Sequence, residues 1–513
     1  MSRGLGDVYK RQAFNSVTLY ANMGITMAAT LLGTRYVLQA LGREDFGLYT
    51  LIASMVALLS FLNVAMAAAS QRFLSYAMGE GDERKISEVF YTSSVIHWLI
   101  ASMLSIGLLA VGEYMIHQVL DIAPHQVRVA EQVLWCMVGG VVLTICAVPY
   151  EAAMNAHEDI AQIAGINIME ALCKLGAAVA ILFLSHDQLL TYALLVLGSQ
   201  LLAFAGKRAF SRRKYAETHF RLHRLQDPAL LKGMLGYAGW NLIGAGCSIA
   251  RYQGAAILLN TFFGLLVNAA YGVAQQVNGF ILFFANSIVR PLRPLIVKAE
   301  GQGDRVRMHQ LAFLSSRVTF LMVSLAIVPL YLNMPFVLAL WLKEVPAGAL
   351  EFCRTFLLLA LINQLTIGSA MAVESVGNIR RLQLIVGSLH VVSLPMGYAA
   401  FCMGYGPVSI MYCMIAEEGV SMLLRIWIAR KDAGVPSGPY LKQVLLPCIL
   451  VFALSYGLGW TTTLLWHEGW GMLMPSTLLS TLALCISGYH LCLSAWEKDR
   501  IREMAGVVVK RKK

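Results

Sequence analysis

The sequence predicts an all-α polytopic integral membrane protein made of two similar halves, and three observations support this prediction. First, 58% of the 513 residues are hydrophobic and only 13% are charged, whereas a soluble domain carries about 25% charged residues. Second, about fourteen apolar segments reach the roughly 20 residues that a helix needs to cross a hydrocarbon core. Third, a motif in the first half recurs in the second.

The apolar segments fall into two sets of six and a final pair. The first set covers residues 13–41, 46–78, 87–112, 129–154, 161–184 and 189–210. The second set covers 229–259, 265–297, 309–332, 349–375, 382–402 and 408–429. The final pair covers 441–465 and 472–496. We therefore expect about 14 transmembrane helices, arranged as two pseudo-symmetric six-helix lobes plus a C-terminal helix pair.

The internal repeat has a constant offset of 222 residues. Its identical positions are Gly79, Gly81, Asp82, Ser93, Ser94 and Leu99, which recur as Gly301, Gly303, Asp304, Ser315, Ser316 and Leu321. In both copies a Gly/Asp turn precedes a long apolar helix. Because six helices separate the copies, both should have the same orientation in the membrane. The two halves should therefore be related by an axis along the membrane normal. Nothing downstream resembles a nucleotide-binding fold, so each turn is interpreted as a hairpin and not as a phosphate-binding loop.

The basic residues indicate the orientation of the chain, whose net charge is +11. If the N-terminus is cytoplasmic, 28 of the 40 Lys and Arg residues fall in or beside cytoplasmic loops and ends, and nine lie within spans. The loops on the opposite side of the membrane hold only Arg43, Arg128 and Lys343. This asymmetry predicts that both termini are cytoplasmic. The most basic loop, 207–232, is interpreted as a cytoplasmic segment that touches lipid headgroups, and not as a nucleic-acid site.

These boundaries divide the chain into five parts. Residues 1–12 are polar and lack an apolar core, so we expect no cleavable signal peptide, and the abrupt change at Ala13 suggests that this segment is not native. The remaining parts are an N-lobe at 13–210 with helices one to six, a basic cytoplasmic connection at 211–228, a C-lobe at 229–431 with helices seven to twelve, and the last two helices with a basic tail at 432–513.

Motifs for enzymatic chemistry are missing from the sequence. It contains no GxxxxGK[ST] phosphate loop, no HExxH and no GxSxG. Its ten Cys residues form no CxxC pair and no Cys/His cluster at metal spacing, so they are interpreted as reduced, small core residues. We therefore expect no enzymatic activity, no cofactor and no metal.

Span eight carries the most informative set of polar side chains. Gln275, Asn278, Asn286, Arg290 and Arg293 fall within roughly a third of the helix circumference. Such a stripe faces water, substrate or another polar helix, although the amides could equally be interhelical hydrogen-bonding groups. The two arginines could instead reach lipid headgroups. Pro291 and Pro294 should bend or end the helix there.

Other spans contain further buried charges. Span one carries a polar seam that includes Asn22 and ends at Arg35, without any Asp or Glu from 13 to 41, and Arg251 lies deeper, in span seven. Cationic residues at such depth suit a phosphate-bearing substrate, because Arg binds phosphate in a bidentate geometry.

The acidic residues within the spans are candidates for structural ion pairs or for ion coupling. Lys174 has Glu170 as its partner one turn earlier, which we interpret as a structural pair. Glu417 and Glu418 lie in the middle of span twelve, where a desolvated carboxylate could couple transport to protons. A salt bridge to Arg425 or to another helix is an equal alternative for them.

Several motifs together resemble the polysaccharide-transport (O-antigen flippase) branch of the multidrug/oligosaccharidyl-lipid/polysaccharide (MOP) exporter superfamily. The resemblance covers about residues 14 to 430. It rests on Thr34-Arg35-Tyr36-Val37-Leu38, Leu41-Gly42-Arg43-Glu44-Asp45-Phe46-Gly47-Leu48-Tyr49, Ala69-Ser70-Gln71-Arg72-Phe73, Val148-Pro149-Tyr150-Glu151-Ala152-Ala153, Gly239-Trp240-Asn241, Leu259-Asn260, Asn268-Ala269-Ala270-Tyr271-Gly272, Gln276-Val277-Asn278 and Leu340-Trp341-Leu342. Relatives often carry Arg where this chain has Tyr271.

The resemblance implies a V-shaped, MATE-like pair of lobes and alternating access driven by a proton or sodium gradient. The implied function is export of a polyprenyl-diphosphate-linked oligosaccharide from the cytoplasmic to the periplasmic leaflet of a bacterial inner membrane. Membrane lipids and polysaccharide polymerase or ligase machinery are the implied partners. In this interpretation Arg35, Arg251, Arg290 and Arg293 hold the diphosphate, and Asn22, Gln275, Asn278 and Asn286 meet the sugar.

Three alternatives remain open. A drug/cation antiporter of the same fold is the first, although span one lacks the carboxylate that such a pump would be expected to use. A peptidoglycan-precursor flippase is the second. A membrane-embedded polysaccharide polymerase or ligase is the third and ranks low, because the longest predicted outside segments, near 113–128 and 333–348, have only about 16 residues.

Overall fold

The structure is a computed structural model of the 513-residue chain. It describes residues 22, 24–30, 32–42, 45–46, 48–49, 52–53, 60–118, 124, 126–183, 187–219, 227–342, 345–465, 469–493 and 498. The predicted segment 1–12, residues 220–226 of the basic connection and the tail after residue 498 lie outside these ranges. The described residues form helices and no strands.

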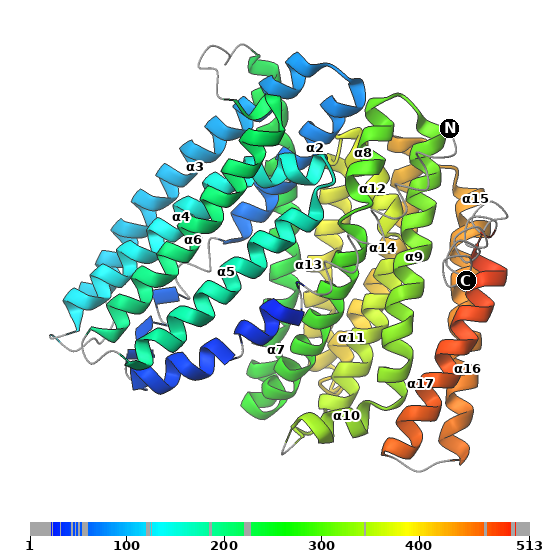
Figure 1. The fold of residues 1–513 in the computed structure, drawn as a ribbon. Helices are drawn as coiled ribbons and strands as arrows, with labels where there is room; N and C mark the ends of the chain where they lie inside the picture. The colour runs from blue at the N-terminus through cyan, green and yellow to red at the C-terminus, as the bar shows by residue number, and fades with distance from the viewer. Residues whose placement is uncertain are drawn as a thin grey trace, which may run out of the picture. The chain divides into compact units, whose positions relative to one another are not determined.

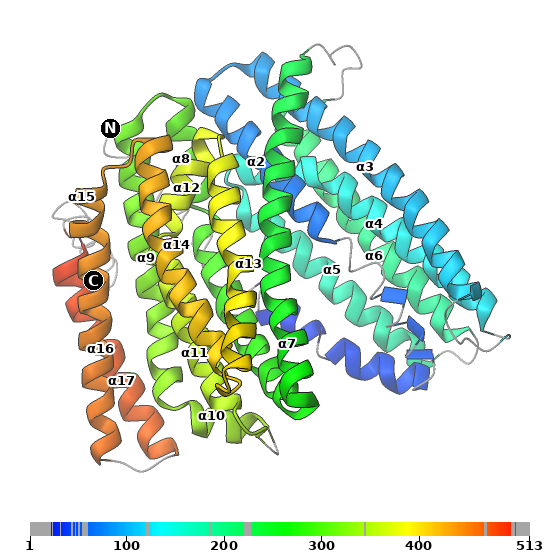
Figure 2. The ribbon, with the colours of Figure 1, turned by 180° about the vertical axis from the view of Figure 1, so that it is seen from behind.

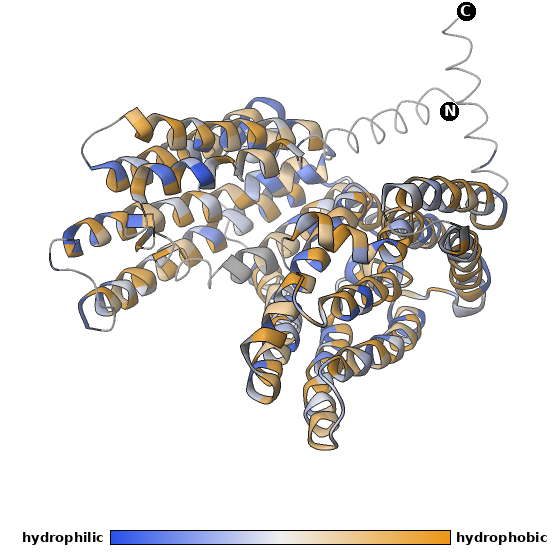
Figure 3. Cartoon of the chain, turned by 90° about the horizontal axis from the view of Figure 1, so that it is seen from below, coloured by the Kyte–Doolittle hydropathy of each residue, from blue (hydrophilic) through white to orange (hydrophobic). Residues whose placement is uncertain are grey.

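The chain divides into two compact units. Unit 1 comprises Met1–Leu242 together with Val297–Gly303, and unit 2 comprises Ile243–Ile296 together with Asp304–Lys513. Apolar residues predominate along the long helices, as the hydropathy colouring in Figure 3 shows. The predicted lobe boundaries at 210 and 229 stay a prediction.

Unit 1 begins with helical residues between 22 and 53 and continues with a set of long helices. Neighbouring pairs in this set are α3 with α4, α4 with α6, and α5 with α6 (Figure 1). The labelled elements are α2 (Ser60–Glu80), α3 (Glu83–Gln118), α4 (Val127–Ala156), α5 (Ile160–Ala180), η1 (Ile181–Phe183), α6 (Gln188–Lys214), η2 (Ala216–Thr218) and the first part of α7 (Pro228–Val289).

Unit 2 contains the rest of α7 and the C-terminal helices. Figure 2 shows α13 and α14 side by side, and α16 pairs with α17. Its labelled elements are α8 (Arg293–Gly301), α9 (Arg305–Leu332), α10 (Met334–Trp341), α11 (Ala349–Gln364), α12 (Ile367–Val376), α13 (Arg380–Cys402), α14 (Ser409–Ala433), α15 (Ser437–Tyr440), η3 (Leu441–Leu445), α16 (Leu446–Leu465), α17 (Trp470–Ser487) and η4 (Gly488–Cys492). The last residues of α8 belong to unit 1.

The described helices confirm a multi-pass arrangement and leave the count of fourteen open. Ten described helices are long and apolar enough to cross a membrane, and an eleventh is obtained if the bent pair α11 and α12 is one span. Helix α14 has 25 residues but is not one of these ten, because Glu417, Glu418 and Arg425 interrupt its apolar sequence. The two predicted spans before residue 78 are described only in part.

The internal repeat folds into two similar turns. Gly81 and Gly303 both have positive φ, at 77° and 73°, a conformation that glycine adopts without steric cost. The carboxylate of Asp82 accepts a hydrogen bond from the backbone N–H of Arg84, and that of Asp304 does the same for Arg307, each at 3.0 Å. Because side-chain acceptors satisfy free N–H groups at a helix start, both copies begin a helix in the same way.

The break between α11 and α12 bends this pair by 47°. The break leaves backbone N–H and carbonyl groups without partners in their own helix, and side chains that are distant in the sequence form hydrogen bonds with them. The hydroxyl of Tyr440 donates to the carbonyl of Leu365 at 2.9 Å, and the N–H of Gly368 donates to Oγ of Ser316 at 2.9 Å. Free backbone groups in an apolar layer need such partners, so α9 and α15 hold the break in place.

Candidate functional site

Five ionisable side chains gather inside unit 2 and define the buried charge cluster: Arg251, His390, Glu417, Glu418 and Arg425. Helix α7 supplies the first, α13 the second and α14 the other three. Each side chain belongs to a residue that is at most 8% exposed. Charges at such depth are expensive unless they are paired, so the geometry of the pairs decides what this cluster can do.

Arg251 connects helix α7 to the two acidic residues. Its Nη2 lies 2.9 Å from Oε2 of Glu417, and its Nη1 lies 3.1 Å from Oε2 of Glu418. The same Nη2 donates to the carbonyl oxygen of Met414 at 3.0 Å. One guanidinium therefore joins two carboxylates and a backbone carbonyl of α14, a use to which its fork of donors is well suited.

Glu418 has a second cation on its other oxygen. Its Oε1 lies 2.7 Å from Nη1 of Arg425, two turns later on α14, and also accepts a hydrogen bond from Nδ2 of Asn363 at 3.0 Å. The salt bridge between Glu418 and Arg425 was one of the alternatives that the sequence offered, and the structure confirms it. Two guanidinium groups and one amide thus neutralise and hold this carboxylate.

Small residues bring α7 close enough to α13 for Arg251 to reach its partners. A Cβ on Gly254 would lie 2.6 Å from Cδ1 of Leu394, and one on Gly244 would lie 1.8 Å from Oε1 of Gln383. Arg251 lies between these two glycines. Close helix approach through small residues is typical of membrane interfaces, and here it positions the guanidinium between two helices.

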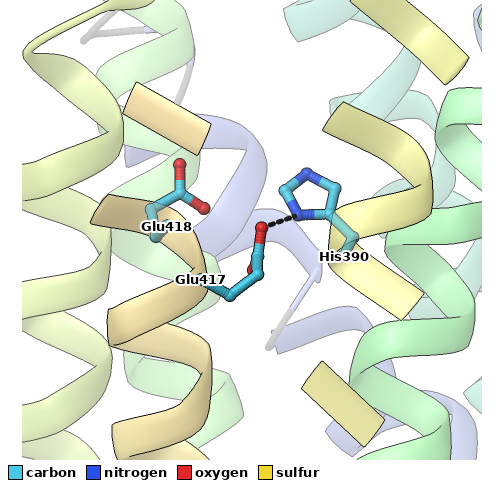
Figure 4. Close-up of side chains that lie close together, drawn as sticks. All are labelled: His390, Glu417 and Glu418. Carbon is cyan, nitrogen blue, oxygen red and sulfur yellow. Dashed lines mark hydrogen bonds and ion pairs between the residues drawn. The ribbon is translucent and has the colours of Figure 1, made fainter. Parts of the chain in front are cut away.

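His390 and Glu417 face each other across the α13–α14 interface, as Figure 4 shows. Nδ1 of His390 lies 3.1 Å from Oε1 of Glu417, which also accepts a hydrogen bond from Oγ of Ser421 at 2.8 Å. Ligand atoms of His390, Glu417 and Glu418 lie within 4.8 Å of one another, a spacing that a metal ion could use. The guanidinium of Arg251 already supplies the positive charge between these groups, so the set fits an ion-pair network better than a metal centre.

Two of the three predicted amides of span eight hydrogen-bond tyrosines of α7 near the cluster. Asn278 is 7% exposed and hydrogen-bonds the side chain of Tyr252, the neighbour of Arg251. Gln275 is half-buried and hydrogen-bonds Tyr271. Asn286 is exposed. Exposure therefore varies along the stripe predicted from the helical period, because Asn278 is buried, Asn286 is exposed and the two arginines beyond it are half-buried.

The predicted cations of span eight do not extend the same helix. Helix α7 ends at Val289, as Pro291 and Pro294 predicted, so Arg290 lies in the turn and Arg293 begins α8. Nη2 of Arg293 lies 3.4 Å from Oε2 of Glu374 on α12. Arg293 is thus a half-buried, paired cation of unit 2.

The two predicted residues of span one belong to unit 1. Asn22 is half-buried and Arg35 is exposed. Three threonines of this seam bond back to the preceding turn of their own helix, for example Thr30 Oγ1 to the carbonyl of Thr26 at 2.8 Å. The structure does not test their contact with a substrate, so that role stays a prediction.

Sequence reasoning missed His390 and Asn363 as members of the network. His390 is the one histidine in its apolar span, and that isolation is the signal that could have identified it. Asn363 stands beside Gln364 in a span with further polar residues, so no such signal marks it. Their partners lie 27 and 55 residues away in the sequence, which no local pattern reveals.

A second group of ionisable side chains lies at the ends of α4 and α6 in unit 1, outside the membrane-spanning segments. Nε2 of His157 lies 2.6 Å from Oε1 of Glu217, and the hydroxyl of Tyr215 donates to the carboxylate of Asp159. Burial, together with the bond to Asp159 and its charge, raises the pKa of Tyr215. His157 and Glu217 also line a cavity of about 430 Å³ beside α3.

No protein-family model and no curated protein matches the sequence. Solved structures of membrane transporters do match the fold. One is an outward-facing multidrug resistance MATE family transporter of the MOP superfamily, with a TM-score of 0.71, 12% identity, and coverage of 83% of this chain and 96% of that one. Another is MATE in the bent conformation, with a TM-score of 0.72, 11% identity, and coverage of 83% and 95%.

A third matching structure is a MOP superfamily transporter from Pyrococcus furiosus. It has a TM-score of 0.69, 12% identity and coverage of 84% of this chain and 96% of that one, and it is described as having a binding pocket of reversed polarity that suggests a different function. The chain is therefore a multi-pass membrane protein with the fold of the MATE transporters. At these identities the similarity establishes the fold, and the cargo must be argued from the side chains.

Proposed function

We propose that this protein is a flippase that exports a polyprenyl-diphosphate-linked oligosaccharide for assembly of a surface polysaccharide of the O-antigen type. The cargo would move from the cytoplasmic to the periplasmic leaflet of a bacterial inner membrane, by alternating access and at the expense of an ion gradient. The motif resemblance of residues 14 to 430 supports the branch, and the MATE fold supports the transport mechanism. A polysaccharide polymerase or ligase would receive the product.

One observation carries the choice of an anionic cargo: the deep carboxylates are already neutralised. Glu417 and Glu418 are held by two guanidinium groups at 2.7 to 3.1 Å. Glu170 lies 2.6 Å from Lys174, which confirms the pair predicted from sequence, and Glu374 lies 3.4 Å from Arg293. An organic cation needs a carboxylate that is free to pair with it, and these four are occupied.

The cationic residues then divide into two groups. Arg35 is exposed and Arg290 and Arg293 are half-buried, so we assign contact with the diphosphate to them and contact with sugar to Asn22, Gln275, Asn278 and Asn286. Arg251 would contact the diphosphate only after its bonds to Glu417 and Glu418 open. We therefore assign Arg251, with these two glutamates, to the coupling of transport to ion movement.

A drug/cation antiporter is the second candidate, and the fold match to a multidrug resistance MATE family transporter favours it. For this function a lipophilic cation would have to displace an arginine from one of the paired carboxylates. The P. furiosus transporter described above suggests that pocket polarity can vary within this fold, which is why the test must compare cargoes of opposite charge.

The test is transport by the purified protein in liposomes. A fluorescent polyprenyl-diphosphate-linked trisaccharide placed in one leaflet should appear in the other under an imposed ion gradient, as measured by fluorescence quenching from outside. Arg35→Gln should slow this transfer at least about tenfold, whereas Arg84→Gln, which changes an exposed cation paired with Glu88, should not. Efflux of ethidium without any transfer of the lipid-linked glycan would establish the antiporter and contradict the proposal.

A further inference from the structure

The imidazole of His390 faces two partners with opposite requirements. Its Nδ1 lies 3.0 Å from Nη1 of Arg251, which can only donate, and 3.1 Å from Oε1 of Glu417, which can only accept when it is ionised. When the neutral ring carries its proton on Nε2, the Nδ1 lone pair accepts a hydrogen bond from Arg251, but it also faces the carboxylate of Glu417, which repels it. When the neutral ring carries its proton on Nδ1, this N–H donates to Glu417 but faces the N–H groups of Arg251, with which it cannot bond.

A proton on Nδ1 therefore decides which partner the imidazole has. The rest of the network also has spare capacity, because Nε of Arg251 has no hydrogen-bond partner and Oε2 of Glu417 pairs with Arg251 without hydrogen-bond geometry. In the arrangement seen, these two atoms of the cluster therefore lack a hydrogen bond. A network of this kind has two alternative hydrogen-bond patterns at His390.

The charge balance connects this choice to the position of α7. The charged groups that act on the imidazole are Arg251 from α7, and Glu417 and Glu418 from α14. Behind them, Arg425 pairs with Glu418, Tyr252 adjoins Arg251, and Cys247 of α7 faces Gly387 of α13. Two guanidinium groups and two carboxylates balance when the ring is neutral. A proton on His390 adds one positive charge to a site that is almost closed to water, and an unbalanced buried charge is unfavourable. The nearest cation, Arg251, must then move away or become hydrated.

We propose that His390 is a proton-binding site that switches its Nδ1 from accepting a hydrogen bond from Arg251 to donating one to Glu417, and so loosens the contact of α7 with α13 and α14. The step is a proton transfer only: water delivers the proton to the Nδ1 lone pair and takes it back when the Arg251 contact re-forms. Proton binding stands independently of the cargo, whereas its use to drive export rests on the function proposed above.

The test of proton binding uses the full-length protein in detergent micelles with isotope-labelled histidine. Among the eleven histidines, the NMR signal that disappears in His390→Gln, or in His390→Asn if the first variant misfolds, belongs to His390. We expect this signal to shift when the protein binds a proton on acidification, and the pH of that change to differ in Glu417→Gln. A signal that does not titrate, or one whose titration is the same in Glu417→Gln, would overturn the proposal.

The matched control is His97, which is also a buried histidine of a membrane-spanning helix. It is 1% exposed on α3 in unit 1, and its Nδ1 lies 2.7 Å from the carbonyl oxygen of Ser93. His97→Gln should leave the signal and titration of His390 unchanged. In liposomes, a pH gradient should stimulate cargo transfer by the native protein and by His97→Gln, and should not stimulate transfer by His390→Gln. If the native protein moves no glycan while the His390 signal still titrates, the proposed cargo fails and the proton site stands.

Discussion

Gly79 at the end of α2 and Gly301 at the end of α8 are equivalent residues of the internal repeat, and their backbones pack against each other within unit 1. A Cβ on Gly79 would lie 2.4 Å from the carbonyl oxygen of Lys298 and 2.9 Å from Cα of Gly301, and a Cβ on Gly301 would lie 2.4 Å from the carbonyl oxygen of Tyr76. Both copies of the motif thus build the same contact, which only glycine allows on either side.

The first prediction is that Gly79→Ala and Gly301→Ala each destabilise the protein by about 1–3 kcal/mol, the usual cost of overpacking. The atoms that an added methyl group would meet belong to the backbone, so no side-chain rotation relieves the overlap. Thermal unfolding in detergent, followed by loss of monodisperse protein, measures the effect. Gly107→Ala on α3 is the control, because a Cβ there meets nothing within 4 Å. Equal melting temperatures for all three variants would contradict the prediction.

The second prediction concerns the shared guanidinium of the buried charge cluster. Arg251→Met leaves Glu417 without its ion-pair partner inside a helical layer, and breaking such a buried pair costs about 3–5 kcal/mol. The variant should therefore show a large fall in folded yield and in melting temperature.

Arg84→Met is the control for this second prediction. Its pair with Glu88 is also an ion pair, but it lies beside the turn before α3 and the arginine side chain is 67% exposed, so solvent screens the change. Similar losses in the two variants would show that the pairs of Arg251 contribute no more than a surface pair.

The extent of the helices was predictable, and the breaks within them were predictable only where proline or glycine marks them. Spans three to six of the sequence correspond to α3, α4, α5 and α6 within a few residues. The helix end at Val289 follows from Pro291, and the non-helical Gly264 falls between predicted spans seven and eight. Apolar length is a local property of the chain, so the sequence reports it directly.

The break at Thr366 and the membership of the charge cluster were not predictable from local patterns. The predicted span 349–375 is continuous in hydropathy, yet Tyr440 and Ser316 satisfy the backbone at its break from 75 and 52 residues away. Arg251 and Glu418 are likewise 167 residues apart. The sequence identified these charges as candidates, but which ones pair depends on helix packing.

The third prediction is a pH dependence at the junction of α4 and η2, outside the membrane-spanning segments. Burial alone would raise the pKa of Glu217, but the hydrogen bond from His157, a hydrogen bond from the backbone of Glu217 and the charge of His157 together outweigh burial, so the pKa lies below its ordinary value of 4.5. A carboxylate with a depressed pKa stabilises the fold above its unfolded pKa, and this stabilisation is lost as the pH falls through the folded pKa.

The native protein should therefore melt at a higher temperature than Glu217→Gln near neutral pH, and the two should converge below about pH 4. Glu88→Gln is the control, because the Arg84 that pairs with Glu88 has a side chain that is 67% exposed. A difference between native protein and Glu217→Gln that grows on acidification would have the wrong sign for this mechanism.

The fourth prediction concerns cargo charge and follows from the pair between Arg293 and Glu374. Glu374 has a side chain that is 20% exposed, so it is accessible once its partner is removed. In Arg293→Gln its carboxylate becomes free to pair with a lipophilic cation. We expect tetraphenylphosphonium to bind this variant about tenfold more tightly than the native protein, a gain of roughly 1.4 kcal/mol.

The double variant Arg293→Gln/Glu374→Gln separates charge from shape in that experiment. It keeps the new glutamine but removes the freed carboxylate, so the gained affinity should disappear and cation binding should return to the native level. Equilibrium dialysis with the labelled cation measures all three proteins under one condition. If the native protein already binds the cation as tightly as Arg293→Gln, the arginine does not occupy Glu374 in solution, and the argument that paired carboxylates exclude cationic cargo loses its basis.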